Sequence, residues 1–333
     1  AGWATMLGSG ARMPPDRTTP SLPPLRVVDS VLDLIGGTPL LRLHRFAPDL
    51  HLFAKLEYLQ PGGSVKDRIG IGMLEAAERA GLITPGRSTI IEPTAGNTGI
   101  ALALACRARG YRLVICMTTK YSREKMMLMK ALGAELVLLP KAAGMQGAIA
   151  RAEELASRIP DAWVPQQFEN PSNPDTHYRT TAEEIWSQME GRVDGVALAA
   201  GSGGTFTGVV RRLKELNPAL VAACVQPVGS VYGGRPQGEW QVEGIGNWWI
   251  PGALDLELAD RILDVRDADA LAVQRQLILE EGCLVAGSAG ANAWAARELA
   301  RTLPAGARVV TVFPDGAERY LSKFPVAEVE VPE

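Results

Sequence analysis

A lysine at the start of an expected helix is the first residue of this sequence with a chemical use. The segment Pro61–Arg68 follows an apolar run, 52–59, that predicts a strand, and apolar residues recur at helical spacing after Lys66. Lys66 would then lie near the positive end of a helix dipole, which disfavours its ammonium form. A neutral lysine amine is a nucleophile that forms imines with aldehydes. Taken alone, this pattern also fits an ordinary solvated lysine in a first helical turn.

A phosphate-binding lysine of the Walker type does not fit this position. That motif requires Gly-Lys followed by Ser or Thr, whereas Val65 precedes Lys66 and Asp67 follows it. The remaining use of Lys66 has to be judged from the other polar turns of the chain.

Three further turns carry small and polar residues at the start of an expected helix. Thr94–Gly99 directly follows an expected strand, and its backbone N–H groups could bind an anion, although Thr94 or Asn97 could equally be a simple helix N-cap. Gly201–Thr205 predicts a phosphate-binding turn rather than a plain tight turn. It is not a dinucleotide fingerprint, because Phe206 stands where the third glycine belongs.

The fourth turn is Gly287–Gly290, where local signals alone favour Ser288 as a helix N-cap. Open α/β sheets bind ligands at the carboxyl ends of their strands, so these turns are expected to converge. A lysine, an anion-binding turn and a phosphate-binding turn together suggest a phosphorylated aldehyde and a small carboxylate substrate. Pyridoxal 5′-phosphate satisfies this combination, with Lys66 for the imine and Gly201–Thr205 for the phosphate.

The elements that would position these turns alternate between strand and helix, which is typical of parallel sheets covered by helices. The expected strands are 40–43, 52–59, 89–92, 112–117, 135–139, 193–200, 220–225 and 308–313. The expected helices are 27–35, 64–80, 97–109, 122–132, 145–158, 178–189, 206–216, 268–281 and 289–302. The irregular segment 227–251 predicts a long loop, which in a compact domain is usually functional or mobile.

Composition limits the possible classes. A chain of 333 residues predicts about two domains, and a net charge of −3 argues against a nucleic-acid partner. No apolar run reaches the ~20 residues that span a membrane. Residues 1–25 are rich in Pro and Gly, which predicts a disordered arm without a secretory signal. The four cysteines have no C-x-x-C spacing, so we expect reduced packing residues in a cytoplasmic protein and no metal site.

Taken together, the motifs resemble the cysteine synthase and cystathionine β-synthase family of fold-type II pyridoxal-phosphate enzymes. The resemblance runs from about Leu32 to about Phe324, with the motifs in the family's order. It rests on Pro61–Arg68, Thr94–Gly99, Gln166–Pro171, Gly201–Thr205, Val242–Gly246 and Gly287–Gly290.

The resemblance implies a tryptophan synthase β-like α/β fold, with two three-layer domains and the cofactor in the cleft between them. The smaller, mobile domain would span 60–165, and the larger one would combine 26–59 with 166–325. The first strands would cross over to join the later domain, and the protein would be a homodimer.

The resemblance also implies a role for individual residues. Lys66 would carry the cofactor imine and shuttle the Cα proton, Asn97 would bind the cofactor's 3′-oxygen, and Ser288 would face its pyridine nitrogen. The phosphate would be held by Gly201, Ser202, Gly203, Gly204 and Thr205. The substrate carboxylate would be held by Thr94, Ala95, Gly96, Thr98 and Gln167, and Gly244 would line the amino side of the cleft.

The expected reaction is β-replacement on an activated serine through an α-aminoacrylate. A serine hydroxyl cannot keep a pyridine nitrogen protonated as a carboxylate would, which favours loss of a β-leaving group over a long-lived carbanion. We expect O-acetylserine and sulfide to give cysteine. The alternatives are cystathionine synthesis with homocysteine, an O-phosphoserine-using sulfhydrylase and a diaminopropionate synthase. Arg235 could bind the phosphate of O-phosphoserine or be a solvated loop residue.

One position departs from the family pattern. Ala95 stands where the family usually has Ser, so one hydroxyl donor near the substrate is lost while the backbone N–H groups remain. A catalytically inactive pyridoxal-phosphate-binding partner protein is the alternative from another class.

Overall fold

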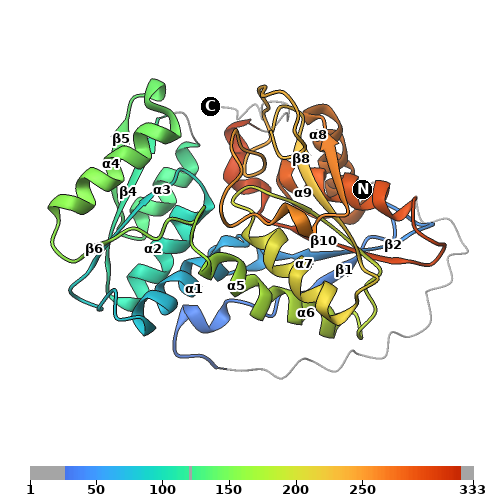
Figure 1. Cartoon of the computed structure of the whole chain (residues 1–333), viewed down its shortest axis with the longest axis horizontal. Helices are drawn as coiled ribbons and strands as arrows, with labels where there is room; N and C mark the ends of the chain where they lie inside the picture. Colours follow the sequence, from blue (N-terminus) through green and yellow to red (C-terminus); the bar gives the residue numbers. More distant parts are fainter. Residues whose placement is uncertain (1–26, 120–121, 324–333) are drawn as a thin grey trace, which may run out of the picture.

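The computed structural model describes residues 27–119 and 122–323, which form two lobes with one β-sheet each (Figure 1). The larger sheet has the strand order β1-β2-β10-β7-β8-β9 and the smaller one β5-β4-β3-β6. The strands of the larger sheet are β1 (Leu40–Arg42), β2 (His51–Leu56), β7 (Gly195–Ala199), β8 (Val221–Pro227), β9 (Arg261–Val265) and β10 (Arg308–Phe313). Those of the smaller sheet are β3 (Thr89–Pro93), β4 (Arg112–Thr118), β5 (Glu135–Leu139) and β6 (Ala162–Trp163).

Helices cover both faces of each sheet. The α-helices are α1 (Lys66–Arg79), α2 (Asn97–Arg109), α3 (Arg123–Ala131), α4 (Gly144–Arg158), α5 (Ser172–Arg179), α6 (Thr181–Gln188), α7 (Gly204–Leu216), α8 (Asp267–Gln276) and α9 (Gly287–Ala300). Short 3₁₀ turns are η1 (Val31–Leu34), η2 (Glu57–Leu59), η3 (Lys141–Ala143), η4 (Leu256–Leu258) and η6 (Ala317–Lys323), and η5 (Leu277–Glu281) is a π-helical turn.

Strand β7 shows why the larger lobe has three layers. Its side chains alternate between the two faces of the sheet, as the pleat of a strand requires. Val196 and Leu198 pack with Phe206 of α7 on one face, whereas Ala197 packs with Ala293 of α9 on the other. The smaller sheet repeats this arrangement, with α1 and α2 in one core cluster and α4 in the other. The predicted α/β class is therefore confirmed.

The first strands do cross to the later part of the chain, because β2 pairs in parallel with β10. The sheet is not wholly parallel, since β1 runs antiparallel to β2. A short connection between consecutive strands favours that direction. The domain limits at residues 60 and 165 stay a prediction, and the arm predicted at 1–25 lies outside the described residues.

Several predicted elements were wrong in extent. The strand predicted at 52–59 ends at Leu56 and gives way to η2, and the helix predicted at 27–35 is only η1. The helix predicted at 178–189 corresponds to α6, and the helix α5 that precedes it was missed. Strands β6 and β9 were missed, because β6 has two residues and the edge strand β9 carries charged residues that hide its apolar pattern.

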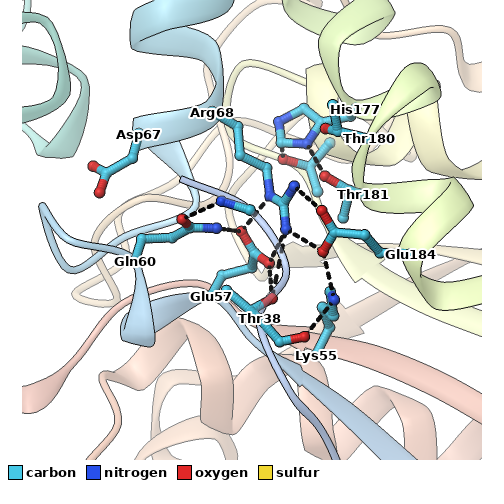
Figure 2. A network of polar contacts seen from close by, with 12 residues as sticks. Thr38, Lys55, Glu57, Gln60, Asp67, Arg68, His177, Thr180, Thr181 and Glu184 are labelled. Atoms are coloured by element: carbon cyan, nitrogen blue, oxygen red, sulfur yellow. Dashed lines mark hydrogen bonds and ion pairs between the residues drawn. The ribbon is translucent and has the colours of Figure 1, made fainter. Parts of the chain in front are cut away.

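A buried ionic network fixes helix α1, and with it Lys66, to the larger lobe (Figure 2). The guanidinium of Arg68 bonds both oxygens of Glu57 at 2.7 and 2.8 Å and both oxygens of Glu184 at 2.7 Å. Lys55 adds an ion pair to Glu184 at 2.6 Å. Thr38 donates a hydrogen bond to Glu57. The network thereby joins α1 to the end of β2 and to α6.

The network keeps its carboxylates ionised in spite of burial. Burial alone would raise the pKa of Glu57, but Arg68 and the hydrogen bonds from Thr38 and Gln60 hold it below the ordinary value. Burial likewise opposes ionisation of Glu184, yet Arg68 and Lys55 lower its pKa to about 2. Removing the guanidinium would therefore leave the buried Glu57 carboxylate without its cationic partner in a low-dielectric interior.

We expect Arg68→Met to lower the free energy of unfolding by about 3–5 kcal/mol, because the fully buried Glu57 loses its partner. Urea unfolding followed by circular dichroism measures this. Arg87→Met is the matched control: Arg87 pairs with Asp161, but the two side chains are 70% and 40% exposed, so the loss is within about 1 kcal/mol. Equal losses in the two variants would contradict this account of the network.

Candidate active site

One cavity is lined by residues from all four turns that the sequence singles out. They lie at the starts of α1, α2, α7 and α9, at the carboxyl edge of the larger sheet and beside the smaller one. The predicted site residues that line the cavity are Lys66, Asn97, Gly201, Ser202, Gly203, Thr205, Gly244 and Ser288. Gly204 is the first residue of α7, directly beside them. The convergence expected from the sheet topology is therefore present.

Lys66 is the first residue of α1 and is partly buried in this cavity. Its helix start is held by Val65, whose backbone N–H donates to Pro314 O at 2.8 Å. Burial lowers the pKa of the Lys66 amine, and the nearby Asp315 carboxylate partly opposes this. Burial thus acts in the same direction as the helix dipole, which also disfavours the ammonium form. A neutral amine is what nucleophilic addition to an aldehyde requires.

The segment Gly201–Thr205, called here the phosphate cup, connects β7 to α7. Gly203 has φ +90°, a left-handed conformation that favours glycine. A Cβ at Gly201 would collide with the backbone oxygen of Gly244. Since α7 begins at Gly204 without a side-chain cap, its first N–H groups lack intrahelical partners and are available to an anion.

The irregular loop 227–251 supports the phosphate cup from outside, which sequence reasoning did not foresee. Tyr232 OH and Asn247 Nδ2 both donate to Gly201 O, at 2.8 and 2.7 Å. In a trans peptide the carbonyl and the following N–H point in opposite directions. The N–H of Ser202 is therefore turned away from this loop. No short sequence motif predicts these two contacts.

His177 of α5 was also missed as a site residue, because a single histidine within a helical stretch has no distinguishing local pattern. Its Nε2 lies 3.1 Å from Thr205 Oγ1, and its Nδ1 lies 2.8 Å from Thr181 Oγ1. Burial, together with the charges of Lys66 and Arg68, holds the pKa of His177 well below its ordinary value. The neutral ring has one donor and one acceptor nitrogen, which suits two hydroxyl neighbours. His177 thus orients Thr205.

Thr94–Thr98, called here the carboxylate loop, leads from β3 into α2. Gly96 is the N-cap of α2 and no side chain caps the helix, so the N-cap alternative for Thr94 and Asn97 is wrong. Ala95 packs in the apolar core cluster of α1 and α2. Thr98 Oγ1 donates to Gln167 Oε1 at 2.6 Å, which brings two predicted carboxylate-binding residues together.

Glu92 lies beneath the carboxylate loop and was not predicted. It is 1% exposed and accepts hydrogen bonds from the backbone N–H groups of Gln166 and Gln167, at 2.9 and 3.1 Å. Burial raises the pKa of Glu92 to about 7, although both hydrogen bonds oppose the shift. Glu92 thereby fixes the backbone on which Gln167 sits.

Ser288 is not an N-cap either, because α9 begins at Gly287 after Ala286. Its hydroxyl donates to Asp315 Oδ1 at 3.0 Å. Asp315 also lines the cavity and was missed by sequence reasoning. The position of Pro314–Gly316 directly after the last strand, at the same sheet edge as the other turns, was a usable signal.

The comparisons with known proteins agree with this geometry. The sequence profile described as "Pyridoxal-phosphate dependent enzyme" matches residues 31–315. The chain belongs to this family. Its cofactor is pyridoxal phosphate.

Similar members of the family cover nearly the whole chain. An O-acetylserine dependent cystathionine beta-synthase of Bacillus subtilis is 42% identical over 301 residues, which is 90% of this chain and 98% of the relative. A cysteine synthase of Staphylococcus aureus is 45% identical over 300 residues, 89% and 96% of the two chains. A solved O-acetylserine dependent cystathionine beta-synthase of Helicobacter pylori has a TM-score of 0.86 and 41% identity, covering 90% of this chain and 99% of that one.

The cavity fits the family's cofactor. Lys66 lines the same cavity as a glycine turn whose packing leaves no room for a Cβ at Gly201 or Gly203, and the polar side chains of Asn97 and Ser288 line it as well. When bound there, pyridoxal phosphate withdraws electrons from the α-carbon of an amino acid. Within 27–119 and 122–323 no cluster of His, Cys, Asp and Glu could hold a metal ion, and no helix is long and apolar enough to cross a membrane.

We expect Glu92→Gln to remove a pH-dependent part of the stability. The pKa of Glu92 rises on folding, so between about pH 4.5 and 7 the folded protein holds a proton that the unfolded chain has released, and the stabilisation is complete only below about pH 4.5. That stabilisation, about 3 kcal/mol, is lost as the pH rises to about 7. Urea unfolding of both proteins from pH 4.5 to 7.5 measures the difference.

The difference in unfolding free energy between the wild-type protein and the Glu92→Gln variant reports the contribution of Glu92 alone. Burial raises the pKa of Asp67 to about 7 as well, but this contribution is present in both proteins and cancels. A stability difference that stays constant across the range would contradict the assignment.

Proposed function

We propose that this enzyme performs β-replacement on O-acetylserine, with sulfide as the nucleophile and cysteine and acetate as products. The observation that carries the proposal is the meeting of Lys66, the phosphate cup and Asn97 of the carboxylate loop around one cavity. The relatives named above supply the substrate: one is called a cysteine synthase and two are called O-acetylserine dependent.

In this proposal Lys66 holds the cofactor aldehyde and later carries the substrate's α-proton. Burial lowers the pKa of the amine, which favours the neutral form that can accept that proton. The phosphate cup, Gly201, Ser202, Gly203, Gly204 and Thr205, binds the cofactor phosphate, with Thr205 oriented by His177. Asn97 and Ser288 face the cofactor ring.

The substrate is oriented by its carboxylate. We assign this group to the N–H groups at the start of α2 and to the carboxylate-loop residues Thr94, Ala95, Gly96 and Thr98, together with Gln167. The hydrogen bond between Thr98 and Gln167 makes them one unit. Gly244 leaves room beside the substrate amino group. The acetate then departs from Cβ, and the sulfur of sulfide bonds to the same carbon.

Cystathionine synthesis from O-acetylserine and homocysteine is the second candidate. It is favoured by the names of the Bacillus subtilis and Helicobacter pylori relatives. Use of O-phosphoserine loses its structural basis, because Arg235 Nε donates to Asp264 at 3.0 Å and Arg235 is not among the cavity-lining residues.

A homodimer in the cytoplasm completes the proposal, and the four free, buried cysteines of the chain suit a reducing compartment.

We expect borohydride reduction of the holoenzyme to attach the cofactor to Lys66, as identified by peptide mapping. Lys66→Ala removes both the covalent link and the proton carrier, so turnover falls by at least about 10²–10⁴-fold. Lys214→Ala is the control, because Lys214 pairs with Asp260 away from the cavity. Label on another lysine, or unchanged turnover of the Lys66 variant, would reject the assignment and favour an inactive binding protein.

We expect kcat/KM to be highest for O-acetylserine with sulfide when O-acetylserine, O-phosphoserine and serine are each paired with sulfide and with homocysteine. Steady-state assays of all six pairs measure this. A higher value with homocysteine would select the cystathionine reaction. A preference for serine or O-phosphoserine would refute acetate as the leaving group.

A further inference from the structure

Helix α5 lies directly against the first turns of α7, because α7 has glycine at the points of closest approach. A Cβ at Gly204 would collide with the side-chain oxygen of Asn173, and a Cβ at Gly208 would collide with the backbone oxygen of Pro174. Gly204 and Gly208 are four residues apart and therefore lie on the same face of α7. This close packing brings the side chain of Asn173 to the phosphate cup.

The side-chain amide of Asn173 is buried and uses its nitrogen for two hydrogen bonds. Nδ2 donates to the backbone oxygen of Gln167 at 2.7 Å and to Ser202 Oγ at 3.0 Å. Oδ1 is buried and has no hydrogen-bond partner within the described residues. A flipped amide would place this oxygen against the backbone oxygen of Gln167, where two acceptors would meet. The nitrogen is therefore the atom that faces Ser202.

The contact with Asn173 fixes the direction in which Ser202 donates. A hydroxyl has one proton to donate and lone pairs that accept. Since Ser202 Oγ accepts the amide N–H, a proton turned toward Asn173 would face another donor. In the part of the chain that the structure describes, Ser202 donates to no protein acceptor. Ser202 lines the cavity, so its proton is free for a ligand there.

A phosphate ester is a ligand that suits this arrangement. Its oxygens are strong acceptors, and the dianion has no proton to offer. A hydroxyl that donates to such an anion makes a charge-assisted hydrogen bond, which is stronger than one between neutral groups. A hydroxyl whose proton already points into the cavity also loses little rotational freedom when the anion binds.

We propose that Asn173 is a positioning residue that acts through Ser202, holding its hydroxyl as a hydrogen-bond donor for the cofactor phosphate. The inference rests on the proposed function, which assigns the phosphate to the cup. The second N–H of Asn173 holds the backbone of Gln167, which we assign to the substrate carboxylate. Helix α5 also serves the other hydroxyl of the cup, since His177, four residues after Asn173, contacts Thr205.

The test measures how tightly the holoenzyme retains pyridoxal phosphate, as the dissociation constant from dialysis against graded cofactor concentrations. The ³¹P chemical shift of the bound phosphate is recorded alongside. We expect Ser202→Ala to raise the dissociation constant at least about 10-fold, as loss of a hydrogen bond to a charged group does. Asn173→Ala leaves the hydroxyl in place but free to turn, so we expect a rise of about 3- to 10-fold. Both variants shift the ³¹P signal.

The double variant decides whether Asn173 acts through Ser202. In the Ser202→Ala background, Asn173→Ala should change the dissociation constant by less than about 2-fold, because the group that it orients is gone. A purely structural role of Asn173 would weaken binding equally in both backgrounds and would overturn the proposal. An unchanged dissociation constant in Ser202→Ala would overturn it as well. If Asn173→Ala does not fold, Asn173→Leu fills the same space without a donor, and the same comparison applies.

Asn217→Ala is the matched control, because Asn217 Nδ2 makes a bond of the same kind, to Val193 O at 2.8 Å, away from the cavity. Its dissociation constant and ³¹P shift should equal those of the wild-type protein. Weakened binding in this variant would show that loss of any such bond beside α7 loosens the cup, and would overturn the role of Asn173.

Borohydride mapping of the wild-type holoenzyme separates this inference from the proposed function. Equal losses in both backgrounds, with the cofactor linked to Lys66, refute only the role of Asn173. Absence of a link to Lys66 refutes the proposed function.

Discussion

The parallel pairing of β2 with β10 is the constraint on which the site depends. Its register places Leu56 beside Phe313, the last residues of the two strands. The chain then leaves both strands at the same edge, so Ser64 meets Asp315 and Val65 bonds Pro314. A lysine near the start of the chain and a carboxylate near its end come together because two strands end at the same level.

A second constraint is the buried polar network behind α1 (Figure 2). The helix that begins with Lys66 is anchored by a residue two positions later, Arg68, whose guanidinium bonds two carboxylates. Buried ion pairs contribute little net stability when compared with well-packed apolar residues, but breaking one is costly. Here the geometry of the network fixes where the helix starts. The position of the lysine amine is therefore set by side chains that do not reach the cavity.

The sequence predicted the site best where residues with a chemical use lie in a local pattern that also predicts a turn followed by a helix. The helix start at Asn97 was placed correctly and the start at Lys66 within two residues, since small polar turns followed by apolar periodicity leave few alternatives. The cofactor class followed from the combination of turns, and the family comparison confirms it. The site roles of the individual residues stay predictions, although the cavity brings most of them together.

What could not be predicted depends on contacts between distant parts of the chain. Glu92 and His177 are single polar residues within apolar or helical stretches, and only the fold places them against Gln167 and Thr205. The neighbours of Ser288 in the sequence suggest a helix cap. Its hydrogen-bond partner is Asp315, which follows α9 and β10 in the chain. Local sequence patterns contain no information about such partners, because these contacts between distant residues depend on the order and register of the strands.

The support of Gly201 by Tyr232 and Asn247 has a consequence for how tightly an anion is held. A glycine-rich turn has many accessible backbone conformations, and ordering it on binding would weaken affinity through lost entropy. Here two side-chain donors already restrict the peptide. The receptor for the cofactor is thus preorganised during folding, and the entropic penalty falls on the folding equilibrium instead of the association step.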